Sequence, residues 1–222
     1  MTVHDVARRL PDIRVLREHC RSMAVLEAIL SPEWESRRHS FDDRWSEAES
    51  MASMRSGSGD EYAIVFSAAG AYVRGFDHES PMSPYATEDG PWPGVVDEVP
   101  EVFRPYVLEP AFTDEDGMPV VTACMWRETV DDRWKAGTID FPEVTTEDPD
   151  GAGYLFQLLV DRSPEAFRRW AEDYHEVPVG LEAVRHVFAS RPLTEDVVRA
   201  LNPGIAVADL SQDIAEIGFS TS

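Results

Sequence analysis

Positive charge is the scarcest feature of this sequence. The chain has 20 Lys and Arg side chains against 42 Asp and Glu, a formal net charge of −22, and Lys135 is its only lysine. Binding to nucleic acid or to an anionic membrane surface requires clustered cations that face the phosphates. The composition therefore argues against both partners. The net negative charge favours solubility, and it also favours a basic protein as partner, because an acidic surface speeds association with a basic protein.

Cysteines and long apolar runs are also lacking. Cys20 and Cys124 are far apart, and neither belongs to a CxxC or Cys/His spacing typical of zinc sites. Two cysteines do not make a disulfide framework in a chain of this length, so we expect buried, reduced thiols. No apolar run approaches the roughly 18 residues of a transmembrane helix, and the N-terminus has no signal-peptide core. We expect a cytoplasmic protein without a membrane span.

The common enzyme motifs are absent as well. The sequences G-x-S-x-G, Walker A, G-x-G-x-x-G and H-E-x-x-H do not occur. The run Asp114-Glu115-Asp116-Gly117 suggests a calcium loop, but Met118 and Met125 stand where an EF-hand needs oxygen ligands, which favours a polar turn. We therefore expect no metal and no cofactor, and we favour a binding protein over an enzyme. A Ser/His/Asp site assembled from distant residues stays open, because such sites are defined by geometry.

The residues that are present predict one long helix, then short strands, then short helices. Ile13, Leu16, Cys20 and Met23 recur at helical spacing, which predicts a helix over residues 12–30. Strands are predicted at 34–41, 49–54, 61–67, 71–76, 120–127 and 133–140, and helices at 152–160, 164–175, 181–190, 194–201 and 209–217. The first four strands are joined by loops too short for crossover helices, so they must be antiparallel neighbours.

These elements predict a single α+β domain over residues 1–222. Its antiparallel sheet of about six strands lies within residues 33–140 and packs against the N-terminal helix and a helical part at 151–222. The residues Ala68, Ala69 and Gly70 suit a hairpin between two of the strands.

A long, acidic, proline-rich loop over residues 77–117 interrupts the strand pattern. It belongs to residues 60–150, which hold 5 basic and 21 acidic side chains. Loops of this length are often functional, although their aromatic residues can equally serve packing. Tight protein binding needs aromatic anchors amid the charge. The candidate binding residues are Trp92, Phe103 and Phe112 as anchors, with Asp114 and Asp116 as acidic contacts for a basic partner.

The stretch 75–84 is the best candidate for a catalytic site, because it places an imidazole, carboxylates and hydroxyls where a strand enters the loop. The candidate residues are Asp77, His78, Glu79 and Ser80, with His78 as general base and Asp77 orienting it. If the strand continued, Asp77 and Glu79 would face away from His78, so one metal ion could be held only if the chain turned. The alternative is a structural turn, in which Asp77 or Ser80 accepts backbone N–H groups.

Several stretches resemble a family of bacterial proteins of about the same size that has no established activity. They are GFDHESPMSP at 75–84, PWPG at 91–94, Cys124–Arg127 with Asp132–Trp134, and DIAEIGF at 213–219. The resemblance runs from roughly Ser31 to Phe219. It implies a soluble bacterial protein and assigns no site.

Two functions follow as expectations. The favoured one is a protein-binding module of the immunity or inhibitor type, which uses its acidic surface to cover a basic protein; small size, acidity and α+β character are the basis of this analogy. The alternative is a hydrolase-like or small-ligand-binding protein with its site at residues 75–84.

Overall fold

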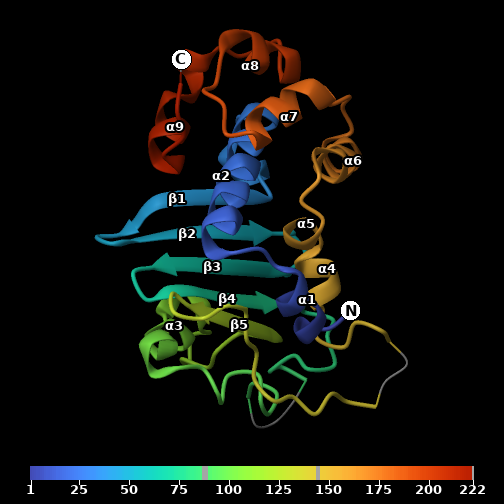
Figure 1. The fold of residues 1–222 in the computed structure, drawn as a ribbon. Coiled ribbons are helices and arrows are strands. Elements are labelled where there is room, and N and C mark those ends of the chain that lie inside the picture. Colours follow the sequence, from blue (N-terminus) through green and yellow to red (C-terminus); the bar gives the residue numbers. More distant parts are fainter. Residues whose placement is uncertain (87–89, 144–145, 222) are drawn as a thin grey trace. The chain divides into compact units, whose positions relative to one another are not determined.

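The computed structural model describes residues 1–86, 90–143 and 146–221. The chain is an α+β protein with a five-stranded antiparallel sheet in the order β1-β2-β3-β4-β5 (Figure 1). Its residues group in two compact units, each made of two separate stretches. Unit 1 comprises Met1–Ile13 and Arg55–Val160, and unit 2 comprises Arg14–Met54 and Asp161–Ser222. The single domain expected over residues 1–222 stays a prediction.

Unit 1 is built on three antiparallel strands. They are β3 (Glu61–Ser67), β4 (Gly70–Phe76) and β5 (Ala123–Glu128), and Val73 of β4 lies opposite Ile64 of β3 and Met125 of β5. The unit also contains α1 (Val3–Arg9), α3 (Arg104–Val107), α4 (Ala152–Leu155), α5 (Gln157–Val160) and the 3-10 turns η2 (Glu101–Phe103) and η3 (Pro110–Phe112). Every residue of β4 is buried, although its side chains alternate between two faces, so both faces of this strand are covered.

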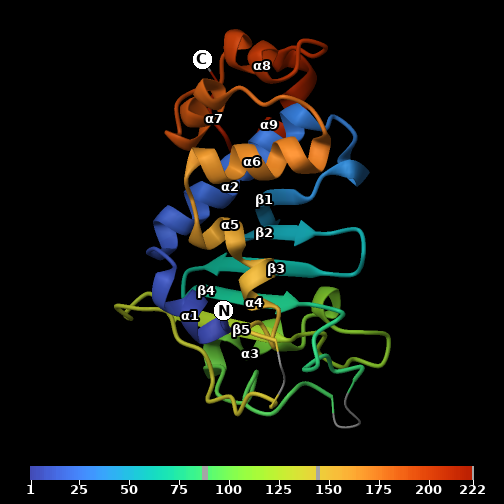
Figure 2. The same cartoon turned by 90° about the vertical axis from the view of Figure 1, so that its right-hand side faces the viewer.

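Helices cover one face of β4, and the acidic loop covers the other. Helix α4 contacts β4 and helix α1 contacts β5, and both helices lie in front of these strands in Figure 2. Gly75 faces this side, where a Cβ atom would come within 2.7 Å of the Phe156 ring, so only glycine leaves room for that ring. On the opposite face, the Tyr72 ring lies 6.5 Å from that of Phe103 and 5.8 Å from that of Tyr106. Aromatic packing thus fastens the acidic loop to the sheet.

Unit 2 combines a long helix, a hairpin and a set of short helices. Its elements are α2 (Ile13–Leu30), η1 (Trp34–Ser36), β1 (His39–Ser46), β2 (Glu49–Arg55), α6 (Pro164–His175), α7 (Leu181–Phe188), α8 (Glu195–Leu201), η4 (Val207–Leu210) and α9 (Ser211–Ile217). Phe41 of β1 lies opposite Ala52 of β2. Helix α6 spans the predicted residues 164–175 and begins after Ser163, whose hydroxyl accepts a hydrogen bond from Ala166 N as an N-cap.

Three predicted strands differ from the structure, and the smallest difference is that the strand predicted at 120–127 is β5, at Ala123–Glu128. Residues 133–140 do not form a sixth strand, because only Lys135 pairs with Trp126, through hydrogen bonds of 2.8 and 2.9 Å in an isolated bridge. The strand predicted at 34–41 lies instead at 39–46, after the turn η1. Pairing with β2, in which Asp42 lies opposite Met51 and Ser46 opposite Glu49, extends this strand beyond Phe41, although Trp45 is the only apolar residue there.

Both cysteines are buried and free, as the sequence predicts. Burial raises the pKa of both thiols, that of Cys124 to about 12. Within the part of the chain that the structure describes, no helix has both the length and the apolar composition of a membrane span.

Candidate functional site

Two carboxylates flank the open end of the β3–β4 hairpin. Asp60 precedes β3, and Asp77 follows β4. Because Glu61 pairs with Phe76 across the two strands, the antiparallel register brings the flanking residues to the same edge of the sheet. The chain turns directly after Asp77, and this turn places His78 beside both carboxylates.

Asp60 holds His78 by two contacts. Its Oδ1 accepts a hydrogen bond from His78 N at 3.2 Å and lies 2.6 Å from the ring Nδ1. The hydroxyls of Ser56 and Ser58 donate to its Oδ2 at 3.0 and 3.3 Å. The hydrogen bond to Asp60 raises the pKa of His78. Burial opposes ionisation of Asp60, but the hydrogen bonds from His78 outweigh it and lower the pKa of that carboxyl. The imidazole is therefore oriented and readily protonated.

Asp77 occupies a more confined position. Its Oδ1 accepts a hydrogen bond from Glu79 N at 2.9 Å, and its own N–H donates to Thr122 Oγ1 at 3.1 Å. Gly151, at φ +70°, lies directly against it, and a Cβ atom there would be 2.3 Å from Asp77 Cβ. Burial raises the pKa of Asp77, and the nearby carboxylates of Asp60 and Asp148 add to this effect.

The three side chains form a possible ligand set for a divalent cation. One ligand atom each from Asp60, Asp77 and His78 lies within 4.8 Å of the others. Two carboxylates and an imidazole suit ions such as Zn²⁺ or Mn²⁺. The absent motifs predicted no metal, and a continuing strand would have separated Asp77 from His78; the chain instead turns after Asp77, the condition under which one ion could be held. Sequence reasoning missed Asp60, although the predicted hairpin would have located it opposite Asp77.

The other two candidate catalytic residues, Glu79 and Ser80, stabilise the turn that follows Asp77. Ser80 is buried, and its hydroxyl donates to Pro149 O at 2.7 Å and accepts from Met82 N at 3.0 Å. Glu79 is exposed and contributes its backbone N–H to the turn. The orienting contact to His78 comes from Asp60, whereas the sequence analysis assigned it to Asp77. A structural turn and a polar cluster are thus combined in residues 77–80.

The three candidate anchors of the acidic loop lie in different environments. Trp92 is half-buried, and its Nε1 donates to Asp140 O at 3.0 Å. Phe103 and Phe112 are buried, with 0% and 5% of their surface exposed. Both are core residues in this conformation, which corrects their expected role as anchors, because a partner cannot reach them.

The two candidate acidic contacts lie in a turn. Asp114 Oδ1 accepts hydrogen bonds from the backbone N of Asp116 and Met118 at 3.0 and 2.8 Å. This is the polar turn that the sequence analysis favoured over a calcium loop. Asp116 is exposed and Asp114 is half-buried, so Asp116 is the more accessible of the two.

Apolar side chains are exposed among carboxylates where the chain crosses η2 and α3. While Phe103 packs inward, Val102 and Leu108 are 46% and 66% exposed. We define the η2–α3 surface by five of the exposed or half-exposed residues of this segment, which are Glu98, Glu101, Val102, Leu108 and Glu109. Sequence reasoning missed Val102 and Leu108, because only the structure shows which apolar residues of this segment face inward.

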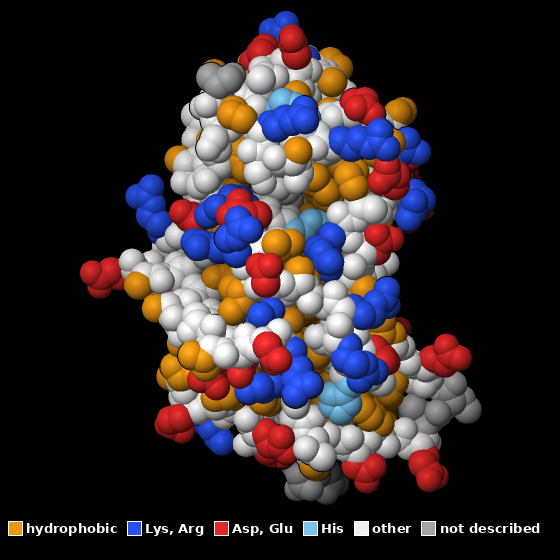
Figure 3. Space-filling view, in the orientation of Figure 1, with side chains coloured by type: hydrophobic (Ala, Val, Ile, Leu, Met, Phe, Trp, Pro, Cys, Tyr) orange, Lys and Arg blue, Asp and Glu red, His pale blue; other side chains and the backbone are white. Residues whose placement is uncertain are grey.

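The charge around the η2–α3 surface is almost entirely negative. Residues 77–117 hold 11 acidic side chains, and Arg104 is their only basic one. Arg104 Nε lies 3.9 Å from Glu101 Oε2, and the Glu101 side chain is 97% exposed. On the face shown in Figure 3, carboxylate side chains follow the lower margin, where loops of unit 1 lie. Carboxylates therefore far outnumber cations in the segment that contains the exposed apolar residues.

Comparisons with known proteins give no match, since no family model, curated protein or solved structure is similar to the chain. The likeness to a bacterial family stays a prediction, and the function must be argued from the residues described above.

Proposed function

We propose that the chain is a protein-binding module of the inhibitor or immunity type, which contacts a basic protein of the cytoplasm through its η2–α3 surface. The observation that carries the proposal is the exposure of Leu108 and Val102 within a loop that has 11 acidic side chains and one basic one. Exposed apolar residues supply contact area, and the surrounding carboxylates steer and select a basic partner.

The packing beneath this surface supports the same role. Phe103 and Tyr106 form a stacked pair, with ring centroids 6.2 Å apart, and both contact Tyr72 of β4. A surface that is already ordered loses little conformational entropy when a partner binds. The η2–α3 surface is therefore suited to a partner that recognises a fixed shape.

The test compares proteins retained from a bacterial lysate by three immobilised forms of the chain. The first is the wild type, and the second replaces Glu98 and Glu101 of the η2–α3 surface with Gln, together with Glu115 of the turn at 114–118 in the same acidic loop. The third is a control of equal charge change, with Glu33, Glu35 and Glu47 replaced by Gln; all six positions are exposed. Retained proteins are identified by mass spectrometry at two salt concentrations, because screening weakens charged contacts between exposed groups.

The proposal predicts one basic protein in stoichiometric amount on the wild type and on the control, released as salt rises and depleted on the Glu98/Glu101/Glu115 variant. No retained protein, or equal retention by both variants, would contradict it.

A second candidate function is binding of a divalent cation by Asp60, Asp77 and His78, which the 4.8 Å clustering of their ligand atoms favours. Calorimetric titration with Zn²⁺ and with Mn²⁺ tests it. Replacing Asp77 with Asn or His78 with Gln should weaken binding at least about tenfold, since each removes one of three ligands. His186→Gln is the control, because His186 belongs to unit 2. Equal affinity in all forms, or no heat of binding, would refute this function.

A further inference from the structure

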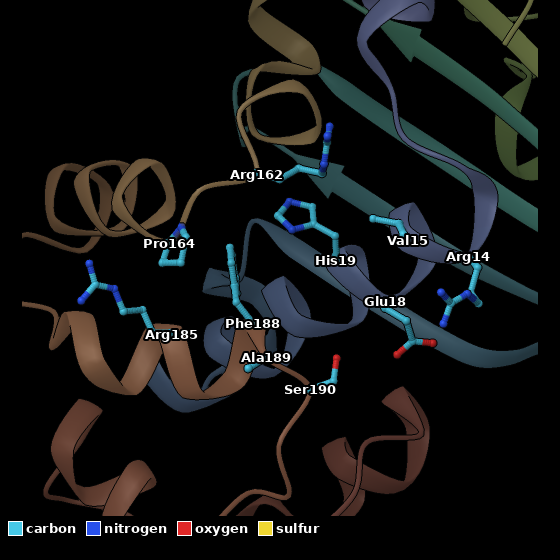
Figure 4. Close-up of a pocket in the computed structure, with 10 residues that line it drawn as sticks. All are labelled: Arg14, Val15, Glu18, His19, Arg162, Pro164, Arg185, Phe188, Ala189 and Ser190. Carbon is cyan, nitrogen blue, oxygen red and sulfur yellow. The ribbon is translucent and has the colours of Figure 1, made fainter. Parts of the chain in front are cut away.

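Unit 2 contains a pocket of about 520 Å³ that the functions above do not use. Figure 4 shows it among α2, the segment that leads into α6, and the C-terminal end of α7. Arg14, Val15 and His19 come from α2, Arg162 from the segment before α6, and Phe188 from α7. Cavities of about 300–1,000 Å³ are typical of sites for small molecules.

The charges that line this pocket are mainly positive. Three arginines and one glutamate face it. The glutamate, Glu18, binds Arg21 at 3.0 Å, and Arg185 is paired with Glu182 at 2.6 Å, so these charges are compensated within the protein. Arg14 is exposed and makes no ion pair with any residue that the structure describes. Its charge is therefore available to a ligand.

Arg162 adds a second cation at the edge of the pocket. The adjacent carboxylate of Asp161 accepts hydrogen bonds from the backbone N and hydroxyl of Ser163 at 3.2 and 2.7 Å, so part of its charge serves the N-terminus of α6. Burial lowers the pKa of Arg162, which means that its guanidinium is partly withdrawn from water. A guanidinium in that setting interacts more strongly with an anion than a fully solvated one does.

The remaining wall is apolar and aromatic. The rings of His19 and Phe188 meet edge to face, 5.0 Å apart. In Figure 4 both side chains point into the space among the helices, with Arg162 beside His19. Val15, at the same end of α2, is 40% exposed. Cations next to an apolar wall suit a ligand that has one charged and one apolar part.

We propose that this pocket binds a small organic anion, a carboxylate or phosphate ester, with its charged group toward Arg162 and its apolar part against Phe188 and Val15. Arg14 lies at the opposite side of the pocket and adds a longer-range attraction (Figure 4). Guanidinium groups match the planar oxygens of carboxylates and phosphates, and such charge-assisted hydrogen bonds are stronger than neutral ones. The pocket is a concentration of positive charge in a chain of net charge −22. It lies in unit 2, apart from every residue of the η2–α3 surface, so it does not depend on the proposed function.

Naphthyl phosphate, naphthoate and neutral naphthol, titrated into the full chain and followed by ligand-observed NMR, test this proposal. The two anions should bind and the neutral compound should not, and their relative affinities distinguish the phosphate ester from the carboxylate. The Arg14→Gln/Arg162→Gln variant should lose at least about tenfold in affinity for the anions. The control, Arg44→Gln/Arg133→Gln, removes the same charge at two exposed sites outside the pocket and should bind as the wild type does.

A second variant tests the apolar wall without removing an arginine. Val15→Glu places a carboxylate at an exposed helical position, where glutamate is well tolerated, and should also weaken binding of the anions. Circular dichroism confirms that each variant is folded. The proposal is overturned if naphthol binds as tightly as the anions, if the arginine variant keeps wild-type affinity, or if neither anion binds.

Discussion

Gly151 is the residue on which the position of Asp77 most directly depends. It adopts φ +70°, and the Asp77 side chain fills the space where a Cβ atom would stand. A side chain at this position would therefore meet two separate obstacles, the backbone conformation and the steric contact.

Replacing Gly151 with Ala should lower the free energy of unfolding by about 2–4 kcal/mol, from backbone strain plus the displacement of Asp77. Gly57→Ala is the matched control, because Gly57 has φ +79° but no atom within 4 Å of the added Cβ, so this substitution introduces backbone strain without a steric contact. It should lower the free energy of unfolding by about 1–2 kcal/mol. Urea denaturation of both variants measures the difference, and equal losses would show that Asp77 is not confined by Gly151.

Asp150, next to Gly151, is a buried carboxyl group that should titrate near neutral pH. Its oxygens accept hydrogen bonds from Val3 N at 2.8 Å and Ala152 N at 3.1 Å. Burial nevertheless raises its pKa to about 6. The native state thus binds this proton more tightly than the unfolded chain, in which an aspartate titrates near pH 4.

Because of this difference, the contribution of Asp150 to stability should fall as pH rises from about 4 to about 6, by up to about 3 kcal/mol. The Asp150→Asn variant lacks the titration. The measurement is the difference in free energy of unfolding between wild type and variant, taken by urea denaturation from acidic to neutral pH. A loss of stability that comes from altered hydrogen bonds and does not depend on pH leaves the slope of this difference against pH unchanged. If the wild-type minus variant free energy of unfolding stayed constant or rose with pH, the raised pKa of Asp150 would be contradicted.

The candidate site illustrates which residue-scale features sequence can predict. The location at residues 77–80 and the alternative of a turn were both available from the order of residue types. The partnership of Asp60 with His78 was not identified, because Asp60 lies 18 positions earlier in the chain. Only the register of the hairpin, with Glu61 opposite Phe76, brings the two together.

At the scale of elements, the η2–α3 segment has an inner and an outer side. Phe103 is fully buried, whereas its neighbour Val102 is 46% exposed. Phe103 was predicted as a surface anchor, with packing as the alternative, and it packs against Tyr72 because burial of a large ring is more favourable than its exposure to water.

Phe103→Ala should therefore cost about 3–5 kcal/mol of stability, because it leaves a cavity against the sheet. Val102→Ala, one residue away on the outer side, should change stability by less than about 1 kcal/mol. Chemical denaturation of the two variants tests this division, and similar losses would mean that the segment has no outer face for a partner.

Helices and hairpins could be predicted from the sequence where the residues of one short stretch determine the structure. Residues 13–30 and 164–175 form helices because their apolar spacing is a local signal, and Ser163 caps the second helix. The absent sixth strand at 133–140 shows the limit of such patterns. Its apolar residues fit a strand, but pairing requires a partner backbone over several residues, and only Lys135 obtains one.

At the scale of the whole molecule, repulsion among carboxylates should limit stability. The net charge is −22, and most of the ion pairs join partly exposed groups, which contribute little each. Raising NaCl from about 20 to about 300 mM shortens the screening length from about 20 to about 6 Å and should raise the melting temperature. The Glu98/Glu101/Glu115→Gln variant has less repulsion between carboxylates, so its melting temperature should rise less with salt than that of the wild type. A melting temperature that falls with salt would show that attraction between ion pairs outweighs the repulsion.

Binding of a basic protein at the η2–α3 surface is tested most directly by hydrogen–deuterium exchange of the chain alone and in complex with the basic protein that it retains from lysate. We expect slower exchange of backbone amides in residues 97–109, which contain the η2–α3 surface, and little change in α6 and α7. Protection confined to α6 and α7, or the failure of the chain to retain any basic protein, would contradict it.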